Sequence, residues 1–128
     1  MAQGEVRFDG RAIVVTGAGR GIGRAHALLL ASRGAMVVVA DNGTDMEGDD
    51  PSPEPANSVV EEIKASQGKA VAFTEDLGTE AGSTGAVETC LKVFGRIDGV
   101  LHNASTVPNL VKVTELSSHD MDVVMRIN

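Results

Sequence analysis

The sequence predicts an α/β fold built on a doubly wound parallel sheet, and two patterns support this prediction. Four short apolar runs, at 12–16, 36–40, 69–73 and 99–102, have the length and composition of buried strands. Segments with the apolar spacing of helices follow these runs. Parallel neighbours need such helical crossovers, and right-handed crossovers allow the strand order 3-2-1-4.

The first two strands flank the clearest helix. The first strand ends at a glycine, and a helix is expected from Gly21 to Arg33. Gly34 then occupies the place of a C-cap glycine. The second strand stops at Asp41. The chain therefore begins with a strand–helix–strand unit.

The acidic segment that follows, residues 42–55, is expected to be a solvated loop because it holds five acids, including Glu47, and three prolines. It lacks the pattern of a calcium-binding loop, and the histidines are scattered, so no metal site is predicted. A helix is expected from Ala56 to Gly68. One face of this helix carries Val59, Val60 and Ile63.

The third and fourth helices differ in the strength of their signals. Val87, Leu91 and Phe94 are spaced for one face of a helix over 79–94, although two glycines lower its propensity. Ser117 and Asp120 have the spacing of a capping box, which predicts a final helix that reaches Asn128.

Composition excludes several classes of function. The net charge of −7 argues against binding to nucleic acid or to anionic membranes, because both require an excess of Lys and Arg. No apolar run approaches the ~20 residues of a membrane span, and residues 1–11 lack the apolar core of a signal peptide. We therefore expect a cytoplasmic protein. The single cysteine, Cys90, is expected to be a buried small hydrophobe.

The glycine-rich stretch Thr16–Gly23 lies between the first strand and the first helix. A tight turn with close backbone approach, followed by the free N–H groups of a helix start, is what a phosphate group needs. The spacing fails the common G-x-G-x-x-G fingerprint and the P-loop pattern, but G-x-x-x-G-x-G fits Gly17, Gly21 and Gly23. A dinucleotide phosphate site is therefore favoured over a glycine-rich turn without a ligand.

Asp41 bears on the choice of dinucleotide. A carboxylate at the end of the second strand can accept both hydroxyls of an adenosine ribose, and it would repel the 2′-phosphate of NADP. Arg20, inside the glycine loop, could counter that effect by binding the phosphate. On this basis we favour NAD over NADP. The alternative is that Asp41 only ends the strand in a turn and contacts no cofactor.

These features resemble the short-chain dehydrogenase/reductase family over essentially the whole chain. The family's N-terminal motif is similar to Thr-Gly-x-x-x-Gly-Ile-Gly at 16–23. Residues 94–98 resemble its lead-in to the fourth strand, and 102–105 correspond to its Asn-Asn-Ala-Gly, with Asn and Ala kept and His102 and Ser105 departing. The acidic insert and the segments after it also resemble the dehydrogenase units of multifunctional hydroxyacyl-CoA enzymes.

The resemblance implies a single Rossmann-type NAD-binding domain over 1–128. Asp76 and Leu77 would contact the adenine, and Asn128 would act in catalysis by helping to position a water in the proton relay. The expected cofactor-binding residues are Thr16, Gly17, Gly19, Arg20, Gly21, Ile22, Gly23, Asp41, Asn42, Asp76, Leu77, Asn103, Ala104 and Ser105.

The family's chemistry also uses a Ser and a Tyr-x-x-x-Lys set in its second half, and this chain contains no tyrosine. We therefore expect the domain to be truncated after the fourth strand and the start of the next helix, and inactive alone. The full-length enzyme would move a hydride between NAD and an alcohol or ketone, as a homo-oligomer. Two alternatives remain, a non-catalytic dinucleotide-binding fragment and, through the glycines at 19, 21 and 23, a methyltransferase. The Thr-Gly start and Asn103-Ala104 favour the dehydrogenase.

Overall fold

The computed structural model describes residues 4–45, 48–107 and 111–128, which form a parallel sheet with helices on both faces. Strands β1 (Ala12–Thr16), β2 (Met36–Ala40), β3 (Lys69–Phe73) and β4 (Gly99–Leu101) run in the order β3-β2-β1-β4. The predicted fold class and strand order are confirmed. Glu47 of the predicted acidic loop lies outside the described residues.

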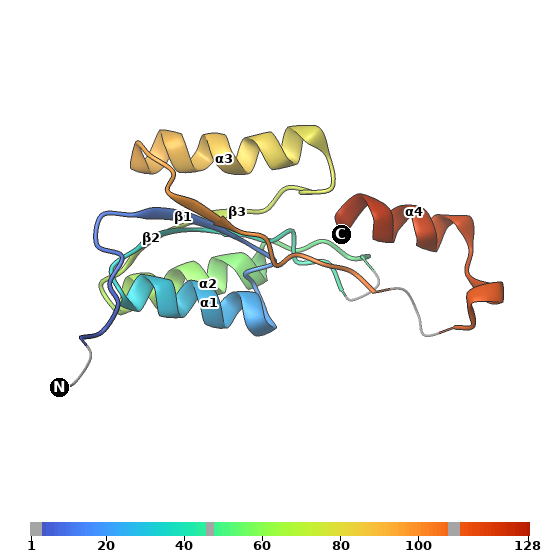
Figure 1. Cartoon of the computed structure of the whole chain (residues 1–128), viewed down its shortest axis with the longest axis horizontal. Coiled ribbons are helices and arrows are strands. Elements are labelled where there is room, and N and C mark those ends of the chain that lie inside the picture. Colours follow the sequence, from blue (N-terminus) through green and yellow to red (C-terminus); the bar gives the residue numbers. More distant parts are fainter. Residues whose placement is uncertain (1–3, 46–47, 108–110) are drawn as a thin grey trace.

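The helices form two layers around the sheet (Figure 1). Helices α1 (Gly21–Ser32) and α2 (Glu54–Ala65) cover one face, and α3 (Glu80–Phe94) covers the other. A short 3₁₀ helix (Val113–Glu115), which the sequence did not predict, precedes α4 (Ser118–Ile127). Helix α4 lies beyond the carboxyl ends of the strands (Figure 1).

The core explains why the first two strands read as continuous apolar runs. Val15, Val37 and Val39 pack toward α1 and α2, whereas Val14 and Val38 pack toward α3. Each of these side chains is at most 1% exposed, and full burial of one such side chain stabilises the fold by about 1.5–3 kcal/mol. The predicted burial of Cys90 and of the α2 face is confirmed.

Some predicted boundaries were wrong by one or two residues. Helix α2 begins at Glu54 rather than at Ala56, because Pro55 occupies the second helical position, where an intrahelical N–H bond is not formed. Strand β4 ends at Leu101. The capping box of α4 is confirmed, but its helix ends at Ile127 and leaves Asn128 as the C-cap. Within the described ranges, no helix has the length and apolar character needed to cross a bilayer.

Candidate functional site

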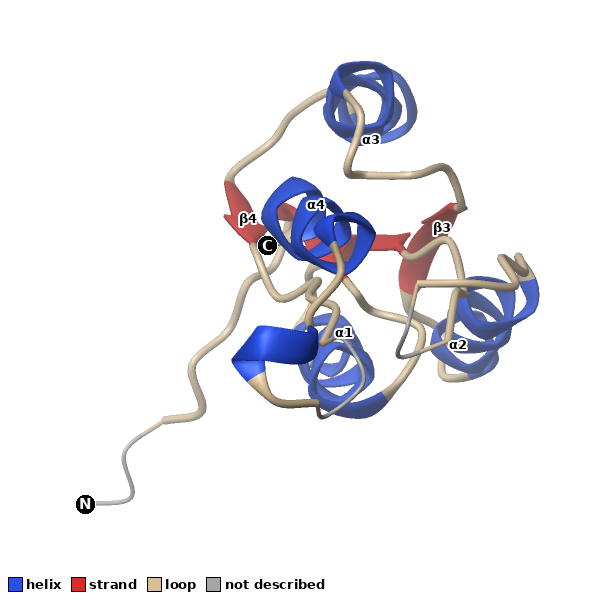
Figure 2. Cartoon of the chain, turned by 90° about the vertical axis from the view of Figure 1, so that its right-hand side faces the viewer, coloured by secondary structure: helices blue, strands red, loops and turns tan. Residues whose placement is uncertain are grey.

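An open cleft with a volume of about 450 Å³ lies at the carboxyl ends of the strands. Its volume is within the usual range for small-molecule sites. Figure 2 views this end of the molecule, with α4 in front of the sheet between α3 and α1. The predicted cofactor residues that line the cleft are Gly17, Arg20, Gly21, Ile22, Asp41, Asn42, Asp76, Leu77, Asn103, Ala104 and Ser105.

Thr16 lies behind the cleft lining and joins β1 to the loop after β4. Its side-chain Oγ1 accepts hydrogen bonds from the N–H groups of Asn103 and Ala104, each at 3.0 Å. In return, the Asn103 amide Nδ2 donates to the carbonyls of Thr16 at 3.1 Å and Gly17 at 3.2 Å. Thr16 and Asn103 therefore hold the glycine loop, residues 16–23, against the loop that follows β4.

The glycines of the glycine loop have different structural roles. A Cβ atom on Gly23 would lie 2.1 Å from the Gly17 carbonyl oxygen, and one on Gly17 would lie 2.8 Å from the Ala104 Cα. These two glycines permit close packing of backbone on backbone. Gly21 has a φ of +56° and would direct a Cβ into open space, and it lines the cleft. At this position glycine leaves the backbone accessible from the cleft.

Asp41 is fixed on the cleft wall by two backbone N–H groups. Its Oδ2 accepts from the Gly19 N–H at 2.8 Å, and its Oδ1 accepts from the Gly43 N–H at 2.7 Å. Gly19 does not line the cleft in the described part of the chain, but a Cβ on it would lie 2.9 Å from the Asp41 carboxylate. Its lack of a side chain lets the acid approach the loop.

The side chain of Arg20 points along the β2–α2 loop. Its guanidinium donates to the carbonyl of Thr44 at 2.9 Å and more weakly to that of Gly43 at 3.5 Å. Arg20 is also the N-cap of α1, and its side chain makes no capping hydrogen bond. Asn42 accepts hydrogen bonds from the N–H and the hydroxyl of Thr44, at 3.3 and 3.2 Å.

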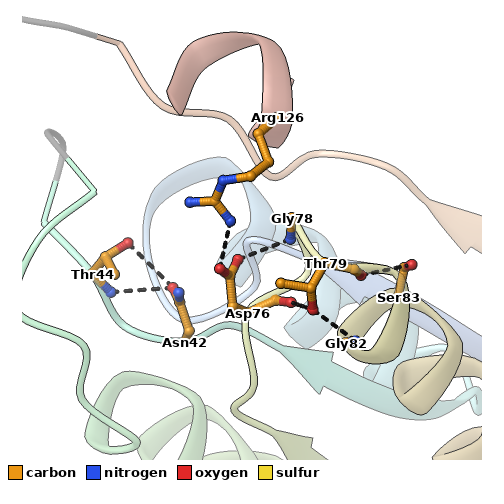
Figure 3. Close-up of polar contacts among 8 residues, drawn as sticks. All are labelled: Asn42, Thr44, Asp76, Gly78, Thr79, Gly82, Ser83 and Arg126. Carbon is orange, nitrogen blue, oxygen red and sulfur yellow. Dashed lines mark hydrogen bonds and ion pairs between the residues drawn. The ribbon is translucent and has the colours of Figure 1, made fainter. Parts of the chain in front are cut away.

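Asp76 lies after β3 and has a partner that sequence reasoning missed. Its Oδ1 accepts from the Gly78 N–H at 2.8 Å, and its Oδ2 accepts from the Arg126 guanidinium of α4 at 2.5 Å (Figure 3). Partial burial alone would raise the pKa of Asp76, but these two hydrogen bonds outweigh it and lower the pKa. Arg126 gave no local signal, since it is far from Asp76 in sequence.

Asn128, predicted to be catalytic, does not line the cleft in the described chain. Its side-chain Oδ1 accepts from the Thr106 N–H at 2.8 Å, and its Nδ2 donates to the Thr106 carbonyl at 3.0 Å. Thr106 itself lines the cleft. The side chain of Asn128 therefore holds the loop after β4, a contact that the sequence did not indicate.

Residues 11–128 match the family model described as short chain dehydrogenase, and the chain belongs to the short-chain dehydrogenase/reductase family. It is 44% identical over 123 residues, 96% of its length, to the peroxisomal multifunctional enzyme type 2 of Mus musculus, of which it covers 16%. It is 39% identical to a putative short-chain type dehydrogenase/reductase of Mycobacterium tuberculosis, over 92% of this chain and 41% of that protein.

Two solved structures are also similar. A short chain dehydrogenase from Mycobacterium avium superposes with a TM-score of 0.83 at 40% identity, over 93% of this chain and 41% of that one. A 7α-hydroxysteroid dehydrogenase complexed with NADH and 7-oxo glycochenodeoxycholic acid superposes with a TM-score of 0.81 at 30% identity, over 95% of this chain and 44% of that one. The chain spans less than half the length of each of these relatives and solved structures.

The chain matches the N-terminal part of this oxidoreductase family, whose members use a nicotinamide cofactor, and family membership does not favour the methyltransferase. The residues present fit a nicotinamide cofactor. The exposed backbone at Gly21 and the start of α1, which has no side-chain cap, offer N–H groups of the kind that bind pyrophosphate. Asp41 and Asp76 both line the cleft, and their carboxylates offer hydrogen-bond acceptors.

Proposed function

We propose that the cleft binds NAD, with the pyrophosphate at Gly21 and Ile22 and the adenosine between Asp41 and Asp76. The observation that carries this proposal is the convergence of residues from the ends of all four described strands on one cleft. In open parallel sheets, ligands bind at the carboxyl ends of strands, where the strand order reverses. Here that position lies between β1 and β4, next to the glycine loop.

The preference for NAD over NADP rests on Asp41 and Arg20. Two backbone N–H groups hold the Asp41 carboxylate in place, so it is pre-oriented to accept ribose hydroxyls and to repel a 2′-phosphate. Arg20, the residue in the loop that could bind such a phosphate, already donates to the Thr44 carbonyl. Moving its guanidinium would break that hydrogen bond.

For the whole protein, we propose hydride transfer between a nicotinamide cofactor and an alcohol or carbonyl substrate; when bound, the oxidised cofactor would accept the hydride from an alcohol and the reduced cofactor would donate it to a carbonyl. This chain's residues would bind and orient the cofactor. Because the side-chain amide of Asn128 is engaged by Thr106, its proposed role in orienting a water would rest on its backbone carbonyl. We further propose a homo-oligomer, since Met121 and Met125 of α4 are 48% and 74% exposed.

We propose a cytoplasmic location, although the name of the mouse relative places that protein in the peroxisome. Microscopy of a tagged gene product would decide between the two compartments.

The cofactor proposal is tested by titrating the complete gene product with NADH and with NADPH and following nicotinamide fluorescence. NADH should bind about tenfold or more tightly than NADPH, since charge-assisted hydrogen bonds contribute about 1.5–3 kcal/mol. Asp41→Ala should weaken NADH binding and narrow the difference in affinity between NADH and NADPH. Glu88→Ala, at an exposed position of α3 outside the cleft lining, should change neither affinity. Absence of saturable binding, or tighter binding of NADPH, would contradict the proposal.

A further inference from the structure

The ion pair between Arg126 and Asp76 connects two distant segments at the cleft. Arg126 belongs to α4 and Asp76 to the loop after β3, and both line the cleft. Figure 3 shows the Arg126 side chain reaching from α4 to the Asp76 carboxylate, whose other oxygen receives the Gly78 N–H.

The loop after β3 is packed closely against the end of α4. A Cβ atom on Gly78 would lie 2.6 Å from the Arg126 Nη1 and 3.0 Å from the Ile127 Cδ1. The absence of a side chain at Gly78 thus lets Arg126 lie directly over the turn that presents Asp76. The two donors approach the carboxylate from the turn and from the helix, and together they fix its rotation.

Stability does not account for this contact. The side chains of Arg126 and Asp76 are 45% and 38% exposed, and an ion pair so open to solvent adds little to the stability of the fold. The terminal torsion of an aspartate side chain has a broad range of allowed angles. If Arg126 were removed, only the hydrogen bond from the Gly78 N–H would remain, and the carboxylate could turn about that bond. The larger consequence of the pair is therefore the orientation of Asp76.

The oriented carboxylate is a specific kind of acceptor. Asp76 is ionised at neutral pH, as an ordinary aspartate is, and the hydrogen bonds from Arg126 and Gly78 lower its pKa further. In this form it can accept hydrogen bonds but not donate them. Each carboxylate oxygen has a second acceptor position beyond the one used by Gly78 or Arg126. A group that donates a hydrogen bond would be favoured there, and a carbonyl oxygen would be repelled.

We propose that Arg126 is a positioning residue for base recognition, which holds Asp76 so that the cleft selects a purine bearing an exocyclic amino group over one bearing a carbonyl at the same position. This inference rests on the proposed function, because it assumes that a dinucleotide occupies the cleft. Arg126 acts through Asp76 and stays outside the chemical step.

The test compares NADH with reduced nicotinamide hypoxanthine dinucleotide, in which a carbonyl replaces the amino group of adenine. Both are titrated by nicotinamide fluorescence into the complete gene product. The unmodified protein should bind NADH about tenfold more tightly, the effect of one charge-assisted hydrogen bond. Arg126→Met should reduce this ratio to about twofold or less, and Arg126→Lys should give an intermediate ratio.

Arg7→Met is the matched control, since Arg7 forms a similar exposed ion pair with Asp9 before β1 and does not line the cleft. It should leave both affinities unchanged. Asp76→Asn, which removes the charge while keeping the shape, should also lower the ratio, and it decides the outcome if Arg126→Met does not fold.

The possible results separate the two proposals. Equal weakening of both dinucleotides by Arg126→Met would mean that Arg126 only holds α4, and would overturn the inference while leaving the cofactor proposal intact. An unmodified protein that binds both equally, or an Asp76→Asn variant that keeps full discrimination, would also overturn it. Failure of the unmodified protein to bind either dinucleotide would overturn the proposed function and this inference together.

Discussion

The wall of the cleft formed by the glycine loop is made of backbone packed on backbone, whereas the wall formed by α4 is attached through side-chain contacts. Thr16 is 7% exposed, and Gly23 leaves no room for even one carbon atom. Helix α4, by contrast, contributes no buried residue in the described chain, and its side-chain contacts reach Asp76 and, through Asn128, Thr106. The glycine-loop wall is therefore as rigid as the core, whereas the α4 wall can move without disturbing the core.

The largest effect is expected from a change in the rigid wall. Gly23→Ala would place a Cβ 2.1 Å from the Gly17 carbonyl oxygen, so the loop must shift. We expect a loss of about 3 kcal/mol in the free energy of unfolding, measured by denaturant titration. Gly99→Ala is the control, because its Cβ would meet nothing within 4 Å. Equal stability of the two variants would contradict the close packing described for the loop.

A smaller and more local effect is expected at the α4 wall. Asn128→Ala removes both side-chain hydrogen bonds to the Thr106 backbone. Since the contact is partly exposed, we expect a loss of about 1 kcal/mol in global stability. Amide hydrogen exchange should accelerate in α4 and leave β1 unchanged. Acceleration throughout the sheet would show that α4 is part of the core.

An effect that depends on pH is expected at the other end of the sheet, where Asp98 joins the start of β4 to β1. Hydrogen bonds from the Arg96 guanidinium and the Ala12 N–H lower the pKa of Asp98 to about 2. Because the folded-state pKa lies below its unfolded value, Asp98 contributes stability above about pH 4 and loses it as the pH falls toward 2.

Asp98→Asn should therefore flatten the pH dependence of the free energy of unfolding between about pH 4 and pH 2, measured by denaturant titration across that window. Asp122→Asn, at an exposed position of α4, serves as the control and should keep the slope of the unmodified protein. An unchanged slope in Asp98→Asn would rule out this linkage.

The same division explains what could be predicted from sequence. The strands, their order and the glycine loop follow from local patterns, because buried parallel strands and phosphate-type turns have distinctive compositions. The contacts of Arg126 with Asp76 and of Asn128 with Thr106 could not be predicted, since each joins segments whose proximity depends on the position of α4. The sequence did not predict that α2 begins at Glu54, because a proline such as Pro55 is typical of loops. In the first turn of a helix, however, proline is tolerated.

The most direct test of the proposed cofactor site is amide hydrogen exchange of the complete gene product with and without NADH. We predict slower exchange at residues 17–23 and 41–44, which border the cleft on the rigid side, together with slower exchange in α4 as the second wall closes on the ligand. Unchanged exchange at 17–23 under saturating NADH would contradict the account, because the glycine loop would then not be where the dinucleotide binds.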